Sequence, residues 1–183
     1  MALSMKIIQD TREQTPLEFP YEFVSEVKIE KLPVGDYTCV YEDGYRVPII
    51  FERKSISDLY GTMGRGYKRF KNEIMLAKTL GIRLVLIIEK PLGTDLKGYE
   101  KSDLSGESVI RKLFTLMVKY DVFPVFCKDR EEMSRYIYEF YCSIGRLMKK
   151  GKYNNAKLPS VSRAGDIQIG GEQGRGNSGG VDL

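Results

Sequence analysis

The segment Val47-Pro48-Ile49-Ile50-Phe51-Glu52-Arg53-Lys54-Ser55-Ile56-Ser57-Asp58-Leu59 carries most of what the sequence predicts about the fold. Its apolar, β-branched beginning indicates a buried strand that runs directly into charged residues. Because side chains alternate between the two faces of a strand, we expect Glu52 and Lys54 to project together and Arg53 to point the other way. The segment therefore predicts an acid and an amine side by side at the end of a buried strand.

A predicted hairpin places a second carboxylate near this strand. Asp36 precedes the strand-like run Tyr37-Thr38-Cys39-Val40-Tyr41, and Asp43-Gly44 between the two runs is a hairpin-turn signal. A hairpin pairs the start of its first strand with the end of its second, so Asp36 should lie close to Glu52 and Lys54. Two adjacent carboxylates repel each other, and a hard divalent cation removes that cost. The pattern favours a metal site that polarises a phosphoryl oxygen with an amine at its side; a surface hairpin with solvated charges is the alternative.

Three stretches occur in order along the chain: Ile7-Ile8-Gln9-Asp10-Thr11-Arg12-Glu13, then Gly35-Asp36-Tyr37 with Glu52-Arg53-Lys54-Ser55-Ile56-Ser57-Asp58-Leu59, then Gly66-Tyr67-Lys68-Arg69-Phe70. Together they resemble the XPF-type nuclease domain of the restriction-endonuclease-like superfamily, in its first strand and Asp-x-Arg-Glu turn, its catalytic signature and its basic helix. The resemblance covers residues 6–145. It implies a restriction-endonuclease-like α/β fold, a three-layer α/β/α sandwich with a central mixed β-sheet.

The resemblance also implies magnesium-dependent cleavage of DNA near branches, flaps or junctions of single strand and duplex, with manganese as a substitute. It assigns the metal carboxylates to Asp36 and Glu52 and the catalytic lysine to Lys54. The supporting catalytic residues that it implies are Asp10, Arg53 and Asp58. Many members of the family carry a tandem helix-hairpin-helix module after the nuclease, and residues 151–183 do not resemble one. A homodimer, or a partner protein that supplies the module, is therefore expected.

Positive charge is concentrated in one stretch, although the net charge of the chain is only +4. Residues 65–78 are basic and are opposed mainly by Glu73, and apolar residues at helical spacing predict a buried face made of Phe70, Ile74, Ala77 and Leu80. The exposed face would contact the DNA backbone, unless it is only a solvated surface. The residues expected to bind DNA are Arg12, Arg65, Lys68, Arg69 and Lys71.

Composition argues against histidine-dependent hydrolases and against a disulfide-bonded, secreted or membrane-spanning protein. There is no histidine, which excludes Ser-His-Asp triads and nucleases with a histidine base. The three cysteines are odd in number and widely spaced, as in a reduced intracellular protein. No apolar run is long enough to cross a bilayer, and no signal peptide is evident. We expect a cytoplasmic, nucleoid-associated protein, or a nuclear one if the source is eukaryotic.

The rest of the chain is expected to complete one nuclease domain over residues 1–150, followed by a flexible Gly/Ser-rich tail over 151–183. The pattern predicts a buried strand at Arg83–Ile88, a loop at Lys90–Leu104, a helix capped by Ser105, an edge strand at 122–126 and a helix at Arg130–Lys149. The core stripe of that last helix would be Met133, Ile137, Phe140, Ile144 and Leu147, with Tyr138 and Tyr141 exposed.

The favoured hypothesis is a metal-dependent, structure-selective DNA endonuclease. A second hypothesis is a DNA-binding scaffold subunit that has lost hydrolysis. The two adjacent carboxylates argue against a scaffold, because a scaffold has no chemical need for them beside a polyanion. A third is an exonuclease of the same superfamily.

Overall fold

The strands of the computed structural model are β1 (Met5–Asp10), β2 (Val24–Glu30), β3 (Tyr37–Tyr41), β4 (Ile49–Lys54), β5 (Arg83–Ile88) and β6 (Phe123–Phe126). The helices are α1 (Ile56–Met63), α2 (Tyr67–Thr79), α3 (Leu92–Leu96), α4 (Gly106–Tyr120) and α5 (Arg130–Lys149). The structure describes residues 3–153. Most of the predicted tail, from residue 154 onward, lies outside the described residues.

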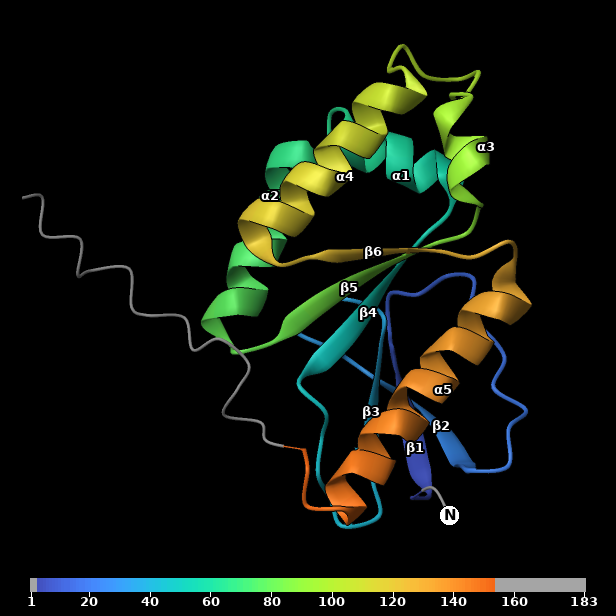
Figure 1. The fold of residues 1–183 in the computed structure, drawn as a ribbon, viewed down its shortest axis with the longest axis vertical. Coiled ribbons are helices and arrows are strands. Elements are labelled where there is room, and N and C mark those ends of the chain that lie inside the picture. Colours follow the sequence, from blue (N-terminus) through green and yellow to red (C-terminus); the bar gives the residue numbers. More distant parts are fainter. Residues whose placement is uncertain (1–2, 154–183) are drawn as a thin grey trace, which may run out of the picture.

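The strands form one mixed sheet in the order β2-β1-β3-β4-β5-β6 (Figure 1). β1 is parallel to β2 and antiparallel to β3. β3 and β4 are antiparallel, with Tyr37 opposite Phe51, which confirms the predicted hairpin. β4, β5 and β6 are parallel to one another. The carboxyl ends of these three strands therefore lie side by side at one end of the sheet, where ligand sites of open α/β sheets usually form.

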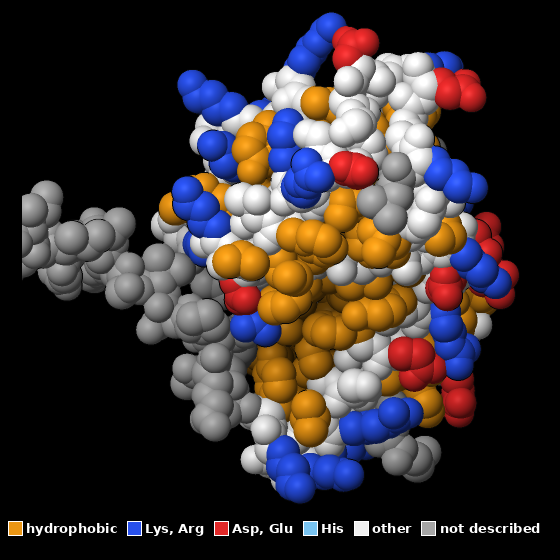
Figure 2. All heavy atoms as spheres, turned by 45° about the horizontal axis from the view of Figure 1, so that its top comes forward, with side chains coloured by type: hydrophobic (Ala, Val, Ile, Leu, Met, Phe, Trp, Pro, Cys, Tyr) orange, Lys and Arg blue, Asp and Glu red, His pale blue; other side chains and the backbone are white. Residues whose placement is uncertain are grey.

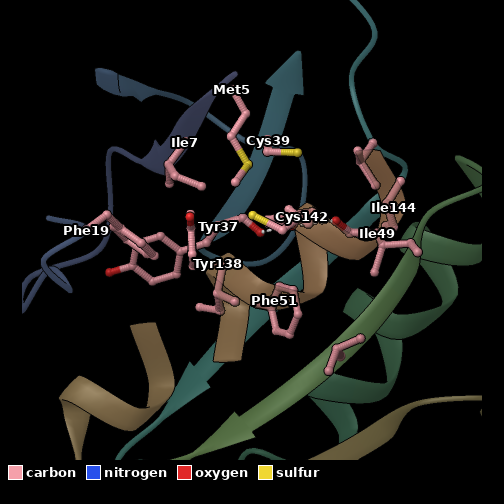
Figure 3. Close-up of a cluster of buried hydrophobic side chains, with 14 of the residues drawn as sticks. Met5, Ile7, Phe19, Tyr37, Cys39, Ile49, Phe51, Tyr138, Cys142 and Ile144 are labelled. Carbon is pink, nitrogen blue, oxygen red and sulfur yellow. Dashed lines mark hydrogen bonds between the residues drawn. The ribbon is translucent and has the colours of Figure 1, made fainter. Parts of the chain in front are cut away.

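Helices cover both faces of the sheet, which confirms the predicted three layers. α5 packs on one face, against a core that contains Tyr37, Phe51 and Ile87 (Figure 3). α1, α2 and α4 pack on the opposite face, around Ile50 and Leu86. Alternate residues of β4 therefore enter different cores, as a strand buried on both faces requires.

Several predicted elements are confirmed. β5 and α5 have the predicted bounds, and β6 lies at one edge of the sheet, as its proline indicated. Ser105 caps α4, because its side chain accepts a hydrogen bond from the Ser108 amide. In all these segments, the pattern of apolar residues or the cap could be identified from local sequence.

Other expectations were wrong. β2 was not predicted, because most of its residues are exposed and it shows no buried face. Lys90–Leu104 contains the short helix α3 and is not only a loop. Leu80 and Leu147, expected on buried stripes, are 49% and 42% exposed, and each lies at or near the carboxyl end of its helix.

The two tyrosines expected at the surface of α5 are also placed differently. Tyr138 and Tyr141 are 7% and 0% exposed. The Tyr141 hydroxyl donates to the Ile49 carbonyl at 2.9 Å, and the Tyr138 ring stacks on Tyr21. A hydroxyl group that finds a carbonyl acceptor allows a tyrosine to be buried. The buried face of α5 is therefore wider than its aliphatic stripe.

Within residues 3–153, none of the helices is both long and apolar enough to traverse a bilayer. Cys39, Cys127 and Cys142 are buried free thiols, which agrees with the prediction that they are reduced residues of the core.

Candidate active site

A cavity of about 490 Å³ opens where the carboxyl ends of β4 and β5 meet the turn after β1. Most of the residues that were predicted to act in catalysis line it. Its walls are formed by Arg12, Glu13, Gln14, Thr15, Asp36, Glu52, Arg53, Lys54, Ser55, Asp58, Glu89 and Arg130. The structure thus brings Asp36, Glu52 and Lys54 to one concave surface. Asp10 lies behind this wall, and the basic residues of α2 lie outside the cavity.

Gly35 allows Asp36 to reach its place beside β4. Gly35 has a positive φ of 66°, and a Cβ atom on it would lie 2.5 Å from the Ile50 side chain. Only glycine combines this backbone conformation with so close an approach. The Asp36 amide then donates to the Phe51 carbonyl at 2.8 Å, and the Asp36 carboxylate accepts from the Arg53 amide at 2.7 Å. The acid is therefore held by the backbone of β4, the strand that carries Glu52 and Lys54.

Glu52 and Lys54 lie on the same face of β4, as their spacing predicted, and form an ion pair. Glu52 is 7% exposed. The Lys54 ammonium lies 5.5 Å from the centre of the Phe70 ring of α2, which gives it a cation–π contact. α2 thus closes one side of the site and fixes the lysine against the buried acid.

Two acids of the cavity, Asp36 and Glu52, have raised pKa values. Burial, followed by the negative charge of Glu52, raises the pKa of Asp36 to about 8. Burial also raises the pKa of Glu52, although the neighbouring Lys54 opposes the shift. Burial alone would lower the pKa of Lys54, but the neighbouring acids, Glu52 first and then Asp36 and Glu73, together outweigh burial and raise it. Near neutral pH the lysine is therefore charged, whereas Asp36 retains a proton until a cation compensates its charge.

Arg53 points to the opposite face, also as predicted. Its guanidinium donates to Glu13 at 3.0 and 3.2 Å and to Glu89 at 3.2 Å, and it contacts Thr15. Arg53 and Glu13 are only 8% and 5% exposed at their side chains. This buried, bidentate pair joins the turn after β1 to the ends of β4 and β5. Arg53 thus braces the wall of the cavity.

Asp10, at the end of β1, holds the turn that follows this strand. Its carboxylate accepts hydrogen bonds from the Arg12 amide at 2.8 Å, the Arg12 guanidinium at 2.6 Å and the Leu32 amide at 2.6 Å. Burial would raise the pKa of Asp10, but these hydrogen bonds, that of Arg12 first, lower it. Asp10 is therefore ionised and orients Arg12, which does line the cavity.

Asp58 and Ser55 form the junction between β4 and α1. The Ser55 hydroxyl accepts a hydrogen bond from the Asp58 amide at 3.1 Å and donates to the Asp58 carboxylate at 2.6 Å. This reciprocal cap ends the strand and starts the helix directly after Lys54. Asp58 also lines the cavity.

In the basic segment, residues 65–78, the charged side chains are exposed or partly exposed and most of the predicted apolar face is buried. Arg65, Lys68 and Arg69 are exposed, and Lys71 lies 5.2 Å from the centre of the Tyr67 ring. Phe70, Ile74 and Ala77 are buried. Glu73, the only acidic residue of α2, faces the site and accepts a hydrogen bond from the Gly35 amide at 3.4 Å. The charges of α2 are thus divided, with the acid toward the cavity and the bases toward solvent.

Several residues of the cavity were not predicted to belong to the site, and two of them come from elements distant from it in sequence. Glu89 follows β5 directly, and Arg130 begins α5. For Glu89 a signal existed, because an acid at the carboxyl end of a strand parallel to β4 must lie at the same edge of the sheet. Arg130 reaches the site from the far end of the sequence, and no local pattern indicates it.

The donors at the site fit a hard divalent cation. Over residues 3–153, no set of three or more acidic or cysteine side chains lies close enough to enclose a metal ion. Among the acids that line the cavity are Asp36 and Glu52, and burial raises the pKa of both. Magnesium is commonly held by one or two carboxylates, with waters and substrate phosphates as its other ligands. The site is therefore suited to a cation that a phosphate helps to bind.

Comparisons with known proteins agree with this architecture. The chain matches the ERCC4 domain over residues 9–140. XPF from Aeropyrum pernix in complex with DNA is similar in structure, with 20% sequence identity and a TM-score of 0.56, over 80% of this chain and 66% of that one. XPF from Aeropyrum pernix without DNA gives a TM-score of 0.54 at 20% identity, over 80% of this chain and 69% of that one. Among curated proteins there is no significant match.

The chain thus spans about two thirds of the length of the archaeal protein in its DNA complex. At this identity the structural likeness shows the fold, and the domain match, which spans most of the chain, shows the family. We conclude that the chain belongs to the ERCC4 domain family, the XPF-type nuclease domains that its motifs resemble.

Proposed function

We propose that this protein is a metal-dependent, structure-selective DNA endonuclease that cleaves phosphodiester bonds near branches, flaps or junctions of single strand and duplex. The observation that carries the proposal is the cavity in which the partly buried Asp36 and the buried Glu52 lie beside the charged Lys54. Two carboxylates held this far from water destabilise each other's ionised form. Such an arrangement is costly in a protein that only binds a polyanion, and useful in one that holds a cation against a phosphate.

Asp36 and Glu52 would hold the metal ion, magnesium or manganese. Bound there, the cation would polarise the phosphoryl oxygen and lower the pKa of an attacking water. Asp36 must release its proton before it can act as a ligand, since its pKa is raised to about 8. Lys54 keeps its proton, because Glu52 raises its pKa. It therefore stabilises negative charge that develops on the phosphate and does not act as a base.

The other groups position these three. Arg53, with Glu13 and Glu89, fixes the ends of β4 and β5 relative to the first turn. The cap formed by Ser55 and Asp58 starts α1 directly after Lys54 and so fixes the end of β4. Arg12, oriented by Asp10, presents a cation at the mouth of the cavity, where it can contact the DNA backbone.

The experiment that tests the proposal is a cleavage assay with Asp36→Asn and Glu52→Gln on flap, fork and plain duplex DNA with magnesium. Each variant should lose cleavage and should bind DNA as tightly as the parent chain or more tightly, because a negative charge that faces phosphate is removed. Arg46→Gln is a suitable control, because Arg46 forms an exposed ion pair with Glu30, away from the cavity. Undiminished cleavage by the Glu52 variant would remove the basis for this site.

The same assay separates the other candidate functions. DNA binding by the parent chain without cleavage in magnesium or manganese would indicate a scaffold. An end-labelled substrate distinguishes an endonuclease, which gives internal nicks, from an exonuclease, which shortens the strand progressively. A second copy of this chain or a partner protein would supply junction recognition, and the oligomeric state with and without branched DNA tests that part of the proposal.

A further inference from the structure

Side chains of α2 and α4 meet along a seam on the outer side of the helical layer. At one end of the seam lies the ring of Tyr67, the first residue of α2. Lys71 of α2 lies 5.2 Å from the centre of this ring, and Lys112 of α4 lies 5.5 Å from it. The ring is thus flanked by one ammonium group from each helix.

The other end of the seam repeats this arrangement with the helices exchanged. The ring belongs to Tyr120, the last residue of α4. Lys78 of α2 lies 5.5 Å from the centre of that ring, and Lys119 of α4 lies 5.6 Å from it. All six side chains are partly or fully exposed. We call the set the α2–α4 strip: Tyr67, Lys71, Lys78, Lys112, Lys119 and Tyr120.

The positive charge of the α2–α4 strip is not compensated. In the part of the chain that the structure describes, none of its four lysines forms an ion pair. The acids of the two helices are engaged elsewhere: Glu73 with the Gly35 amide, and Glu107 with Arg111 at 2.9 Å. In Figure 2, lysine and arginine side chains gather over the region where Figure 1 places α2 and α4. The surface is therefore complementary to a polyanion.

The α2–α4 strip starts next to the candidate active site and leads away from it. Phe70, one turn after Tyr67, is the residue whose ring contacts the ammonium of Lys54. From Tyr67 to Lys78 the helix advances by about 16 Å at its ordinary rise per residue. Lys112 is also fixed in place, because its ammonium donates to the Met63 carbonyl at 2.7 Å. None of the six residues lines the cavity itself, so a ligand bound along the strip would extend toward the cavity from outside.

We propose that the α2–α4 strip binds a single strand of nucleic acid, with phosphates at the lysines and bases against the two tyrosine rings. Aromatic rings interleaved with basic side chains suit an unpaired strand, since stacking on a protein ring requires a base face that duplex pairing hides. The inference rests on the proposed function in one respect: only if the cavity cleaves DNA does the strand bound to the strip lead toward a site of cleavage. Binding to the strip itself does not require hydrolysis.

The experiment measures binding of a labelled single-stranded oligonucleotide, and of a duplex of equal length, to the full chain in EDTA as salt is varied. The variant Lys71→Met/Lys78→Met/Lys112→Met/Lys119→Met should bind the single strand at least about tenfold more weakly. The slope of log affinity against log salt should flatten by up to about 3, at roughly 0.7 for each lost phosphate contact. The double variant Lys71→Met/Lys119→Met provides the same test with a smaller effect if the quadruple variant does not fold.

A matched control removes four exposed basic residues from the end of α5 and the segment after it, on the other side of the sheet: Arg146→Met, Lys149→Met, Lys150→Met and Lys152→Met. This control should keep most of the single-strand affinity. An equal loss in the control and in the strip variant would overturn the proposal. So would displacement of the oligonucleotide by poly-glutamate at the same concentration of charge, because the strip would then bind acidic polymers in general.

The rings are tested by comparing two substitutions at each tyrosine. Tyr67→Leu and Tyr120→Leu should each weaken single-strand binding about fivefold or more, whereas Tyr67→Phe and Tyr120→Phe should change it less than twofold. Duplex affinity should be nearly unchanged in all four. Equal losses for single strand and duplex would overturn the assignment to an unpaired strand. Because binding is measured without metal, loss of cleavage in Asp36→Asn, or its persistence, does not affect this result.

Discussion

The ionisation of Asp36 determines how the charge of the site depends on pH. Its carboxylate is partly buried beside Glu52, and its one polar partner among the described side chains and backbone groups is the Arg53 amide. A single amide cannot offset both burial and a neighbouring negative charge. The ionised acid is therefore unfavourable in the folded chain until a cation binds.

This leads to a prediction for stability. Because the pKa of Asp36 is about 8 in the folded chain and is raised from 3.8, the folded state holds a proton that the unfolded state has lost. Without metal, the contribution of this proton to stability is complete below pH 4 and is lost as pH rises through about 8. Asp36→Asn should therefore be more stable than the parent at pH 8, by on the order of 1 kcal/mol.

Urea unfolding of both chains between pH 5 and pH 8.5, in EDTA, checks this prediction. The difference between the two should widen with pH, and magnesium should narrow it by stabilising the parent alone. Parallel pH profiles would show that Asp36 is ionised without difficulty in the folded chain.

A second prediction concerns Lys54. Its ammonium is the one cation that contacts Glu52 within the described residues, and α2 covers it. Lys54→Ala should lower the cleavage rate on the order of a hundredfold, as expected for the loss of one preorganised electrostatic group. Single-turnover cleavage at saturating DNA measures it. Lys54→Arg retains charge and should recover part of the rate, whereas full activity in the alanine variant would exclude a role in the chemical step.

At the scale of elements, the connection into β3 is the least adaptable part of the site. Gly35 has a positive φ, and its Cα faces the Ile50 side chain and the Phe51 carbonyl. Gly44, in the turn between β3 and β4, also has a positive φ, but no atom lies within 4 Å of its potential Cβ. Comparing substitutions at the two glycines therefore distinguishes the cost of a positive φ, which both share, from the cost of a steric clash, which only Gly35 would add.

We predict that Gly35→Ala destabilises the chain by about 3 kcal/mol or more, because strain at positive φ adds to a clash inside the hairpin. Gly44→Ala should cost only about 1 kcal/mol, from the positive φ alone. Chemical denaturation of both variants gives the comparison. Similar losses would mean that Ile50 can move aside, and Asp36 with it.

The site was more predictable from the sequence than the elements around it. Glu52, Lys54 and Asp36 could be placed because alternation along one strand and one hairpin turn fix their relative positions. The partners of Arg53 could not, because Glu13 and Glu89 come from different strands that only the assembled sheet brings together. The surroundings of Tyr141 were misjudged for the same reason, since its acceptor belongs to β4.

At the scale of the whole molecule, the order of the strands was not readable from the sequence. β2 pairs in parallel with β1 at an edge, and its residues are mostly exposed, so neither periodicity nor burial distinguishes it from a loop. The three layers were expected from the family resemblance, and the continuous apolar runs of β4 and β5 agree with them, because such strands require helices on both faces. The pairing that sets β1 between β2 and β3 depends on contacts distant in sequence.

The composition of the last thirty residues gives a prediction for the whole chain. Residues 154–183 are rich in glycine and poor in large apolar side chains, and such segments bury too little surface to offset the entropy of ordering them. A chain that ends at Tyr153 should unfold within about 2 °C of the full chain, where 1 kcal/mol corresponds to a few degrees. Calorimetry of both chains tests this, and a much lower melting temperature would assign a packing role to the tail.

The two faces of β4 have different tasks, and this restricts how the segment can change during evolution. Point substitutions can change the pair Glu52 and Lys54 on one face, or the Arg53 contacts with Glu13 and Glu89 on the other, independently. Insertion or deletion of a single residue would exchange even and odd positions beyond it, and would bring the Arg53 guanidinium to the face that now carries Glu52 and Lys54. Related chains of the family should therefore differ here in residue identity and keep the same length.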